Sequence, residues 1–303
     1  MKNILVIGGT GFLGSAVVRE LARRTASADS CFTLPTRRRE RAKHLIVLPT
    51  VRVVDADVHD PATLARLMEG QDAVINLVGI LKGGEGQPYG KGFARAHVEL
   101  PSKIAAAAKA AGVSRVLHVS ALKAAADAPS GYLRSKAAGE AALREAGLDL
   151  TIFRPSVIFG RGDSFLTLFA KLAKIAPLFP LAGANARFQP VWVEDVAAVI
   201  ADSLQHAGSM GAAYDLCGPT QYSLRQLVGY AAAVAGHPRA IIGLPEAVAW
   251  LQAWAMEFIP NGPMTRDNVR SMRVPSVCDG DCALPFGRSA TPLETIAPTY
   301  LGS

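Results

Sequence analysis

The stretch Asn3-Ile-Leu-Val-Ile-Gly-Gly-Thr-Gly-Phe-Leu-Gly14 decides the fold of this 303-residue chain. Its apolar run, Asn3 to Ile7, is typical of a short strand that is buried on both faces. Three glycines follow, and then apolar residues recur at helical spacing from Phe12 to Arg24. A glycine-rich turn between a strand and a helix predicts a dinucleotide-binding loop, because the free N–H groups of the helix N-terminus bind a pyrophosphate.

Three glycines of this loop have a predicted role. Gly8 permits the tight turn, Gly11 lets the backbone approach a phosphate, and Gly14 lets the helix pack closely on the strand. The other residues of the predicted binding loop are Thr10, Phe12 and Leu13. The Gly-Lys-Ser/Thr ending of a nucleoside-triphosphate loop is absent. The alternative is a glycine-rich turn without a ligand.

Strands and helices alternate through the first half of the chain. Further strands are expected at residues 31–34, 51–54, 73–78, 115–120, 150–153 and 213–216. Further helices are expected at residues 61–68, 98–111, 132–145 and 193–205. Strands separated by helices form parallel sheets through right-handed crossovers, so we predict an α/β fold with a Rossmann-type doubly wound parallel sheet. Such sheets bind ligands at the carboxyl ends of their strands.

The rhythm changes after Arg154, where prolines separate shorter elements. We expect a smaller, mostly helical C-terminal lobe from about residues 156–186 and 218–303, lying over the ligand edge. Residues 1–155 and about 187–217 would form the dinucleotide-binding domain. A last helix is predicted from its cap, first-turn proline and capping-box acid, which are Thr291, Pro292 and Glu294.

The second strand ends in Pro35-Thr-Arg-Arg-Arg39, and this ending bears on the cofactor. An NAD site usually carries an acid here for the ribose 2′-hydroxyl, whereas arginine suits a 2′-phosphate by charge and geometry. Arg37 and Arg38 therefore favour NADP(H), with NAD(H) and a merely solvated basic turn as the alternatives. After the third strand, Asp57 and Val58 are predicted to contact the adenine, although an exposed loop acid fits Asp57 equally.

The charge distribution supports a specific anionic ligand. The chain has 32 Lys and Arg against 25 Asp and Glu, a formal net charge of +7. Five basic residues and one acid lie between Arg37 and Lys43, a local sum of +4. The remaining excess is too small to argue for nucleic acid, and neither aromatic–basic interleaving nor a helix-turn-helix pattern predicts nucleic-acid binding.

Tyr132 and Lys136 stand four residues apart and share one face of a predicted helix. A phenol is a poor acid–base catalyst at neutral pH, but a nearby ammonium stabilises the phenolate and lowers the pKa of the tyrosine. Beside a nicotinamide, the pair would move a proton to or from a carbonyl or alcohol during hydride transfer. Ser120, at the end of the fifth strand, would bind the substrate oxygen. The alternative is a surface tyrosine and lysine.

Together these segments resemble the extended short-chain dehydrogenase/reductase superfamily, and within it the atypical branch that contains the NAD(P)H-binding accessory subunit 9 of complex I and its bacterial relatives. The glycine loop is common to the superfamily. The arginine-rich second strand and the late segments at residues 264–270 and 291–301 are the part that resembles this branch.

The resemblance implies more of the cofactor site. Tyr132 and Lys136 would lie near the nicotinamide, and the additional cofactor-binding residues would be Leu77, Val78, Gly79, Pro155, Ser156 and Val157. Active relatives usually contribute an Asn from the helix after the fourth strand, whereas this sequence has Ala96-His-Val98. Turnover is therefore the open part of the prediction, and His97 is either a proton relay or a structural histidine.

Two functions follow from the resemblance. The preferred one is an accessory protein that binds NADP(H) and supports the assembly, stability or quinone metabolism of a respiratory complex. The alternative is an active NADP(H)-dependent reductase or dehydrogenase, or an epimerase or dehydratase, acting on a hydrophobic carbonyl or quinone-type substrate. Its catalytic residues would be Ser120, Tyr132 and Lys136. The expected location is cytoplasmic, peripheral to the inner membrane, with a respiratory complex or membrane surface as partner.

The four cysteines are expected to be ordinary thiols. They are too few and too scattered for a disulfide framework, and the Cys278-x3-Cys282 pair lacks the further ligands that a metal needs. Thiols of this kind fit a reducing cytosol. No metal site is predicted.

Two late helices carry side chains whose role the sequence leaves open. Trp250, Trp254 and Phe258 fall in helical register, and would meet a quinone, a lipid or membrane interface, or the other lobe. A second helical face would meet phosphate headgroups, an acidic partner or solvent alone, and it consists of Arg266, Arg270 and Arg273.

Overall fold

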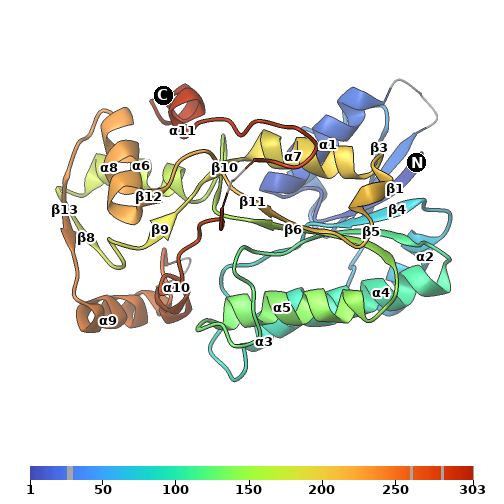
Figure 1. Ribbon diagram of the computed structural model, residues 1–303, viewed down its shortest axis with the longest axis horizontal. Helices are drawn as coiled ribbons and strands as arrows, with labels where there is room; N and C mark the ends of the chain where they lie inside the picture. Colours follow the sequence, from blue (N-terminus) through green and yellow to red (C-terminus); the bar gives the residue numbers. More distant parts are fainter. Residues whose placement is uncertain (26–29, 260–261, 281–282, 303) are drawn as a thin grey trace.

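The computed structural model describes residues 1–25, 30–259, 262–280 and 283–302. Seven parallel strands form its central sheet in the order β3-β2-β1-β4-β5-β6-β11 (Figure 1). These strands are β1 (Asn3–Ile7), β2 (Cys31–Thr36), β3 (Val51–Asp55), β4 (Ala73–Asn76), β5 (Arg115–Val119), β6 (Asp149–Pro155) and β11 (Ala213–Leu216). The strand order reverses between β1 and β4, so the predicted Rossmann fold is confirmed.

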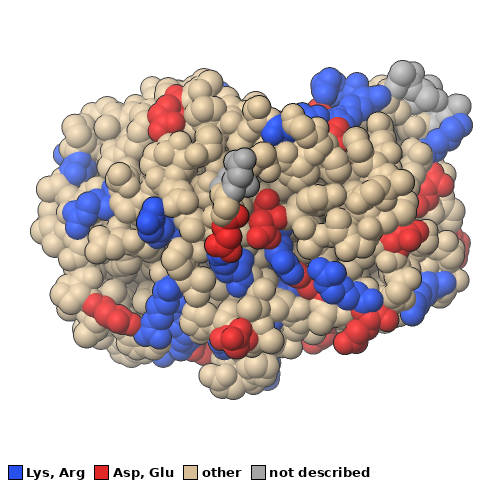
Figure 2. All heavy atoms as spheres, viewed as in Figure 1, with Lys and Arg blue, Asp and Glu red and all other residues tan. Residues whose placement is uncertain are grey.

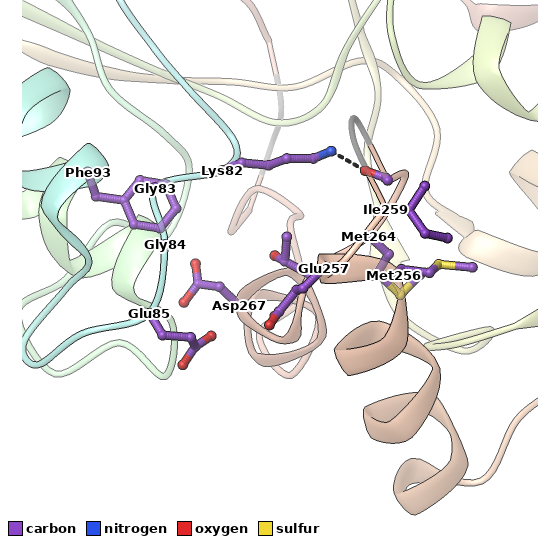
Figure 3. Close-up of a pocket in the computed structure, with 12 residues that line it drawn as sticks. Lys82, Gly83, Gly84, Glu85, Phe93, Met256, Glu257, Ile259, Met264 and Asp267 are labelled. Atoms are coloured by element: carbon purple, nitrogen blue, oxygen red, sulfur yellow. Dashed lines mark hydrogen bonds between the residues drawn. The ribbon is translucent and has the colours of Figure 1, made fainter.

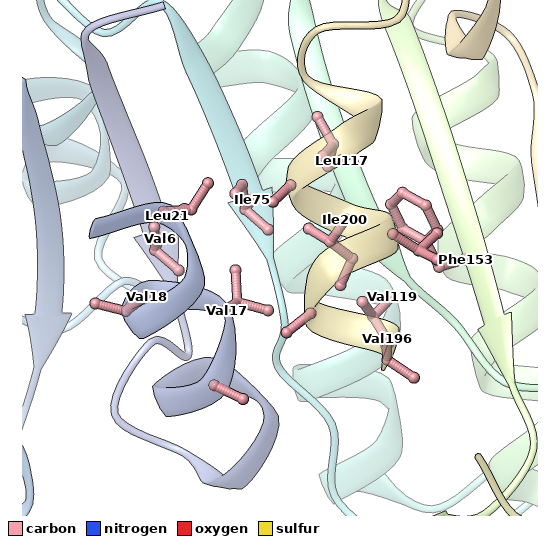
Figure 4. Packing of buried hydrophobic residues seen from close by; sticks show 14 of the residues in the cluster. Val6, Val17, Val18, Leu21, Ile75, Leu117, Val119, Phe153, Val196 and Ile200 are labelled. Atoms are coloured by element: carbon pink, nitrogen blue, oxygen red, sulfur yellow. The ribbon is translucent and has the colours of Figure 1, made fainter. Parts of the chain in front are cut away.

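Helices cover both faces of this sheet (Figure 1). One face carries α1 (Phe12–Arg24) and α7 (Val193–Ser203), and the other carries α2 (Pro61–Met68), α4 (Leu100–Ala110) and α5 (Gly131–Arg144). Figure 4 shows the first face, where Val17 of α1 and Ile200 of α7 pack over Ile75 of β4. Because both faces are buried, the strands have the continuous apolar runs that the sequence displays.

Most element boundaries follow the sequence, and the exceptions have local causes. The strand expected at residues 73–78 ends at Asn76, because the Asn76 side-chain oxygen accepts the N–H of Val78 (3.2 Å) and turns the chain. The helix expected at residues 98–111 begins earlier. A short helix, α3 (Lys91–Phe93), continues through a π-helical turn, η2 (Ala94–Glu99), into α4.

The C-terminal lobe is helical apart from short strand pairs. In it, α6 (Leu166–Ile175) packs with α8 (Leu224–Val234), and β8 (Leu178–Leu181) pairs with β13 (Ala240–Gly243). The chain then forms α9 (Glu246–Glu257) and α10 (Arg266–Ser271), which Figure 1 shows near the start of α5. The remaining short elements are η1 (Arg39–Ala42), β7 (Ile158–Phe159), β9 (Arg187–Phe188), β10 (Val191–Trp192), η3 (Ala207–Ser209), β12 (Tyr222–Ser223), α11 (Leu293–Ile296) and α12 (Pro298–Leu301).

The C-terminal segment returns to the sheet domain. Leu284 belongs to the core cluster of the first face, and Arg288 binds Asp202 of α7. The expected capping role of Thr291 is wrong: its N–H (2.7 Å) and hydroxyl (3.1 Å) donate to Asp195 of α7, and no side chain caps α11. A tertiary contact thus takes the place of a local one. The domain boundaries near residues 156, 187 and 218 stay a prediction.

The expectation of ordinary thiols is wrong for two cysteines. Cys217 and Cys278 form a disulfide, although 61 residues separate them in the sequence. Gln189 aligns their two segments, because its side chain donates to Gly218 (2.8 Å) and accepts the N–H of Cys278 (3.0 Å). Cys31 is a free thiol, and Cys282 lies outside the described residues. The argument for a reducing compartment from unpaired cysteines therefore falls away.

We predict that Gly139→Ala destabilises the fold at the contact of α5 with the π-helical turn. A Cβ at Gly139 would stand 2.0 Å from the carbonyl oxygen of His97, so the two helices would have to separate. Overpacking of this kind costs about 1–3 kcal/mol, which urea denaturation measures. Gly208→Ala is the control, because a Cβ there has nothing within 4 Å. Equal unfolding free energies of the two variants would contradict this packing.

Candidate functional site

The glycine loop joins β1 to α1, and its glycines leave the backbone uncovered by side chains. Gly8 has a φ of +84°, and a Cβ there would lie 3.1 Å from backbone of Leu77 and 3.2 Å from that of Val78. A Cβ at Gly14 would lie 2.2 Å from the carbonyl oxygen of Gly8. Gly11 is the N-cap of α1, where no side-chain hydrogen bond caps the helix. The loop therefore fits a pyrophosphate at the N-terminus of α1.

Some of the other predicted loop residues line a cavity, and one packs in the core. Thr10, Gly11 and Phe12 line a cavity of about 590 Å³ together with three basic side chains, Arg19, His44 and Arg161. Leu13 packs against the core of the first face instead. Glu194 lines the same cavity and forms an ion pair with Arg19 (2.8 Å), so the charge of the lining is mixed.

Arg37 and Arg38 directly follow the carboxyl end of β2. Both are exposed, and within the described ranges neither side chain has an ion pair or hydrogen bond. Because β2 is the neighbour of β1, they stand at the same edge as the glycine loop. Asp57 and Val58, which follow β3, belong to this edge too, and Asp57 accepts the N–H of His59 (3.0 Å). Their contact with adenine stays a prediction.

Lys136 joins the turn after β4 to the end of β5. Its ammonium donates to the carbonyl oxygens of Val119 (3.1 Å) and Val78 (3.4 Å), and a Cβ on Gly79 would lie 3.4 Å from Nζ. Burial lowers the pKa of Lys136 to about 8, although the carboxylate of Glu140 acts in the opposite direction. The cation is therefore aimed at the ligand edge beside the glycine loop.

Tyr132 stands at the N-terminus of α5, which two side chains cap. The Ser130 hydroxyl accepts the N–H of Leu133 (3.2 Å). The Asp267 carboxylate of α10 accepts the N–H groups of Gly131 (2.7 Å) and Tyr132 (3.0 Å). The first N–H groups of a helix lack partners within it, so oxygen acceptors stabilise them. Ser130 of the sheet domain and Asp267 of the C-terminal lobe therefore both fix the start of α5, where Tyr132 lies.

The Tyr132 ring packs edge-on against Phe93 (6.0 Å between centroids) and His97 (5.6 Å). Burial raises the pKa of Tyr132 to about 12. The expectation that Lys136 lowers this pKa is wrong, because removal of the phenol from water dominates. At neutral pH the phenol is protonated, so it is equipped to donate a proton.

Ser120 follows the end of β5, next to the Val119 carbonyl that Lys136 binds. Its side chain is buried, and its hydroxyl has no hydrogen-bond partner among the described residues. A buried polar group without a partner is costly in a folded protein. The Ser120 hydroxyl thus has an open hydrogen bond, and its contact with a substrate oxygen stays a prediction.

His97 has a structural role. Its Nε2 accepts the N–H of Ile80 (3.0 Å), so the proton sits on Nδ1 and is donated to the Ser135 hydroxyl (2.9 Å). Burial, with Lys136 nearby, lowers the pKa of His97 to about 2 and that of His118 to about 3. Both rings are neutral, and His97 is committed to backbone and helix contacts rather than to proton relay.

The turn that was expected to line the nicotinamide is held by the C-terminal segment. The Ser156 hydroxyl donates to the carbonyl oxygen of Ser276 (2.7 Å). Pro155 and Val157 flank it, and the carbonyl of Val157 accepts the N–H of Val191 (3.0 Å). The Ser156 hydroxyl is therefore occupied, and its N–H also donates to the carbonyl of Leu216 (2.9 Å). The contact of this turn with a cofactor stays a prediction.

A cavity of about 380 Å³ opens between the sheet domain and the lobe (Figure 3). Phe93, which contacts Tyr132, forms one wall. Lys82 reaches across to the carbonyl of Gly262. The apolar part of the opposite wall comes from Met256, Ile259 and Met264. Apolar walls with a few polar groups are typical of small-molecule sites.

The arginine stripe is neutralised within the chain. Arg266 binds Glu257 (2.8 Å), and Arg270 binds Glu85 (3.0 Å). Arg273 binds Glu246 (2.5 Å). Figure 2 shows acidic and basic side chains interspersed along the lower edge of the molecule. The stripe thus offers little free charge to headgroups or an acidic partner.

Sequence reasoning missed Asp267 and Phe93, which place the Tyr132 backbone and ring. Asp267 lies 135 residues from Tyr132, in a first helical turn where an acid is ordinary. Phe93 belongs to a helix that begins before the expected one. Neither position carries a local signal for contact with Tyr132, because tertiary folding alone creates the contact.

The profile of the NAD(P)H-binding family matches residues 8–207. The chain belongs to this family. It is 31% identical to the mitochondrial NADH dehydrogenase [ubiquinone] 1 alpha subcomplex subunit 9 of Rattus norvegicus, over 95% of this chain and 77% of that protein. It is 34% identical to the ceramide reductase of Caulobacter vibrioides, over 64% of this chain and 58% of that protein. The resemblance to the atypical branch is confirmed.

Solved structures confirm the fold. An NADPH-dependent quinone oxidoreductase from Escherichia coli, solved with NADPH, superposes with a TM-score of 0.77. The match covers 99% of this chain and 100% of that one, at 23% identity. At this identity the likeness concerns the fold.

We predict that the free energy of unfolding of the wild type, minus that of Lys136→Met, increases as the pH is raised. The pKa of Lys136 is about 8 in the folded protein and near the ordinary lysine value of 10.5 in the unfolded chain. Between these values the unfolded chain binds more protons, so raising the pH favours the folded wild type by about 1–3 kcal/mol. Urea denaturation of both proteins between pH 7 and the upper pKa measures the difference. A difference that does not change with pH would contradict the buried position of Lys136.

Proposed function

We propose that this chain binds NADP(H) and reduces the carbonyl group of a hydrophobic or quinone-type substrate. The Ser120 hydroxyl carries the proposal, since it is buried beside the backbone that anchors Lys136 and has no hydrogen-bond partner among the described residues. Cofactor binding in general follows from membership of the family. The preference for NADP(H) over NAD(H) rests on Arg37 and Arg38, whose free guanidiniums suit a 2′-phosphate.

The chain offers three groups to the reacting atoms. When bound, NADPH would supply a hydride to the carbonyl carbon. Ser120 would donate a hydrogen bond to the carbonyl oxygen, and the protonated phenol of Tyr132 would give that oxygen its proton. Lys136 would bind a ribose hydroxyl with its remaining N–H, and water would reprotonate the tyrosinate after the transfer. The high pKa of Tyr132 suits the direction of reduction, because a protonated phenol is the form required.

The cavity beside Phe93 is the proposed substrate site. Its carboxylates are engaged, with Glu257 and Glu85 in ion pairs and Asp267 at the start of α5. The lining therefore presents mainly apolar side chains to a ligand. An uncharged apolar substrate with one carbonyl group fits such a lining best.

A second candidate is an accessory protein that holds NADP(H) without turnover in a respiratory complex. The segment Ala96-His-Val98 favours it, because the resemblance matches this segment with the region where active relatives carry an Asn, and His97 is bound to Ile80 and Ser135. The similarity to complex I subunit 9 also favours it. Turnover separates the two functions, and cofactor binding is common to both.

We predict that replacing Arg37 and Arg38 together by alanine weakens NADPH binding about 10- to 100-fold, through loss of charge-assisted hydrogen bonds to the 2′-phosphate. NADH binding should change little. Titration calorimetry with both cofactors measures this, with Arg144→Ala, in the last turn of α5, as control. Equal losses for both cofactors, or tighter binding of NADH by the wild type, would contradict the assignment.

We predict that Tyr132→Phe lowers reductase turnover at least about 100-fold while NADPH still binds, because the proton donor is removed. NADPH oxidation with hydrophobic aldehydes, ketones and quinones is the assay. Tyr214→Phe, on β11, serves as control. A wild type that binds NADPH tightly but oxidises it no faster than Tyr132→Phe would instead establish the accessory function.

A further inference from the structure

Helix α9 is built with its larger apolar side chains outward. The positions that face the protein are small: Ala249 is 2% exposed and Ala253 is fully buried. Apart from Glu246 at the start of the helix, the outward positions are apolar and recur at helical spacing, namely Ala247, Val248, Leu251, Trp254, Ala255 and Phe258. Leu251 is 60% exposed and Phe258, the C-cap, 73%. A surface helix normally shows the reverse pattern.

The sequence left open whether Trp254 and Phe258 pack against the other lobe. Their exposure shows that they do not. The two rings contact each other, 5.1 Å between centroids, and Trp254 is 45% exposed. Trp250 differs, because the guanidinium of Arg270 lies over its ring, 4.9 Å from the centroid. The polar side chains of α9 are also engaged, with Gln252 donating to the carbonyl of Pro180 (3.1 Å). The helix is thus anchored by its polar residues and leaves its apolar face uncovered.

The uncovered surface continues onto the neighbouring strand pair. Leu178 of β8 (41% exposed) and Ile242 of β13 (51% exposed) lie on the outer side of these strands, and Ile175 at the end of α6 is 79% exposed. β13 leads into α9 through two residues. We name the outward residues of α9 together with these three the apolar patch. Contiguous exposed apolar surface of this kind marks an interaction site.

Free positive charge lies beside this patch. Lys171 and Lys174 of α6 are exposed, and within the described ranges neither has an ion pair or side-chain hydrogen bond. Arg239, just before β13, donates only to the carbonyl of Ala173. The acids of these segments, Glu246 and Glu257, are paired with arginines of the α10 region. The patch is therefore apolar with a basic border, which complements a surface of anionic lipid.

We infer that α9 docks this protein on an anionic lipid surface, lying in the plane of the interface with Leu251, Trp254 and Phe258 inserted. Twelve residues of helix span about 18 Å, less than the roughly 30 Å of a bilayer core. Among the described residues no helix is long and apolar enough to cross a membrane. The last turn of α9 also supplies Met256 to the cavity beside Phe93, so docking would bring that cavity close to the lipid.

The test is flotation of the whole protein with vesicles of phosphatidylcholine and phosphatidylglycerol, compared with vesicles of phosphatidylcholine alone. We expect binding to the anionic vesicles that falls at least about 10-fold in Trp254→Ser/Phe258→Ser, and about 10-fold in Lys171→Gln/Lys174→Gln or at high salt. Ile46→Ser/Val47→Ser is the matched control, since these side chains are 44% and 77% exposed outside the patch. It should bind like the wild type.

Two measurements keep the outcome decisive. Thermal unfolding of every variant, followed without ligand, verifies that it is folded. Light scattering after gel filtration tests a second copy as the occupant. Failure of the wild type to float with anionic vesicles, equal flotation of the Trp254/Phe258 variant, or a dimer that this variant dissociates would each overturn the proposal. The result does not depend on cofactor binding or turnover.

Discussion

The carboxylate of Asp267 is the contact on which the arrangement of the site depends. It accepts the N–H groups of Gly131 and Tyr132, the first two of α5, and it comes from a helix of the other lobe. Since unpaired N–H groups and the helix dipole both favour a negative charge at this point, the contact joins the lobes and fixes the start of α5 in one step. Tyr132 and Lys136 are carried on that helix, so its placement sets where both side chains point.

Several buried polar groups around this helix are engaged in hydrogen bonds. Lys136 is held by two carbonyl oxygens, and His97 bridges Ile80 and Ser135. Buried polar groups that are fully paired stiffen a structure, whereas an unpaired one is costly. Among the described residues, Nε2 of His118 and the Ser120 hydroxyl lack partners here, and Ser120 is the one that follows the end of β5. Rigid surroundings with one open hydrogen bond are suited to holding a substrate oxygen in place.

The C-terminal segment holds the lobe to the sheet domain by several kinds of bond. The Cys217–Cys278 disulfide, the Ser156–Ser276 hydrogen bond and the Thr291–Asp195 contacts act along one stretch of chain. Of these, the Ser156–Ser276 hydrogen bond holds the turn after β6, and the Thr291–Asp195 contacts hold the segment to α7. By contrast, α9 has no such cover on its outward face. The C-terminal segment is therefore attached to the sheet domain, whereas the outward face of α9 is apolar and exposed.

The sequence by itself determined the sheet, the glycine loop and the basic end of β2. Those features are local: a strand, a turn and a helix are encoded by residues within a few positions, and the reversal of strand order follows from the crossovers. Tertiary structure decided the rest. Four features depend on residues far apart in the chain: the disulfide of Cys217, the hydrogen bonds of Thr291 to Asp195, the high pKa of Tyr132 and the capping of α5 by Asp267. Burial and long-range pairing set them, and neither can be read from the spacing of residues along a sequence.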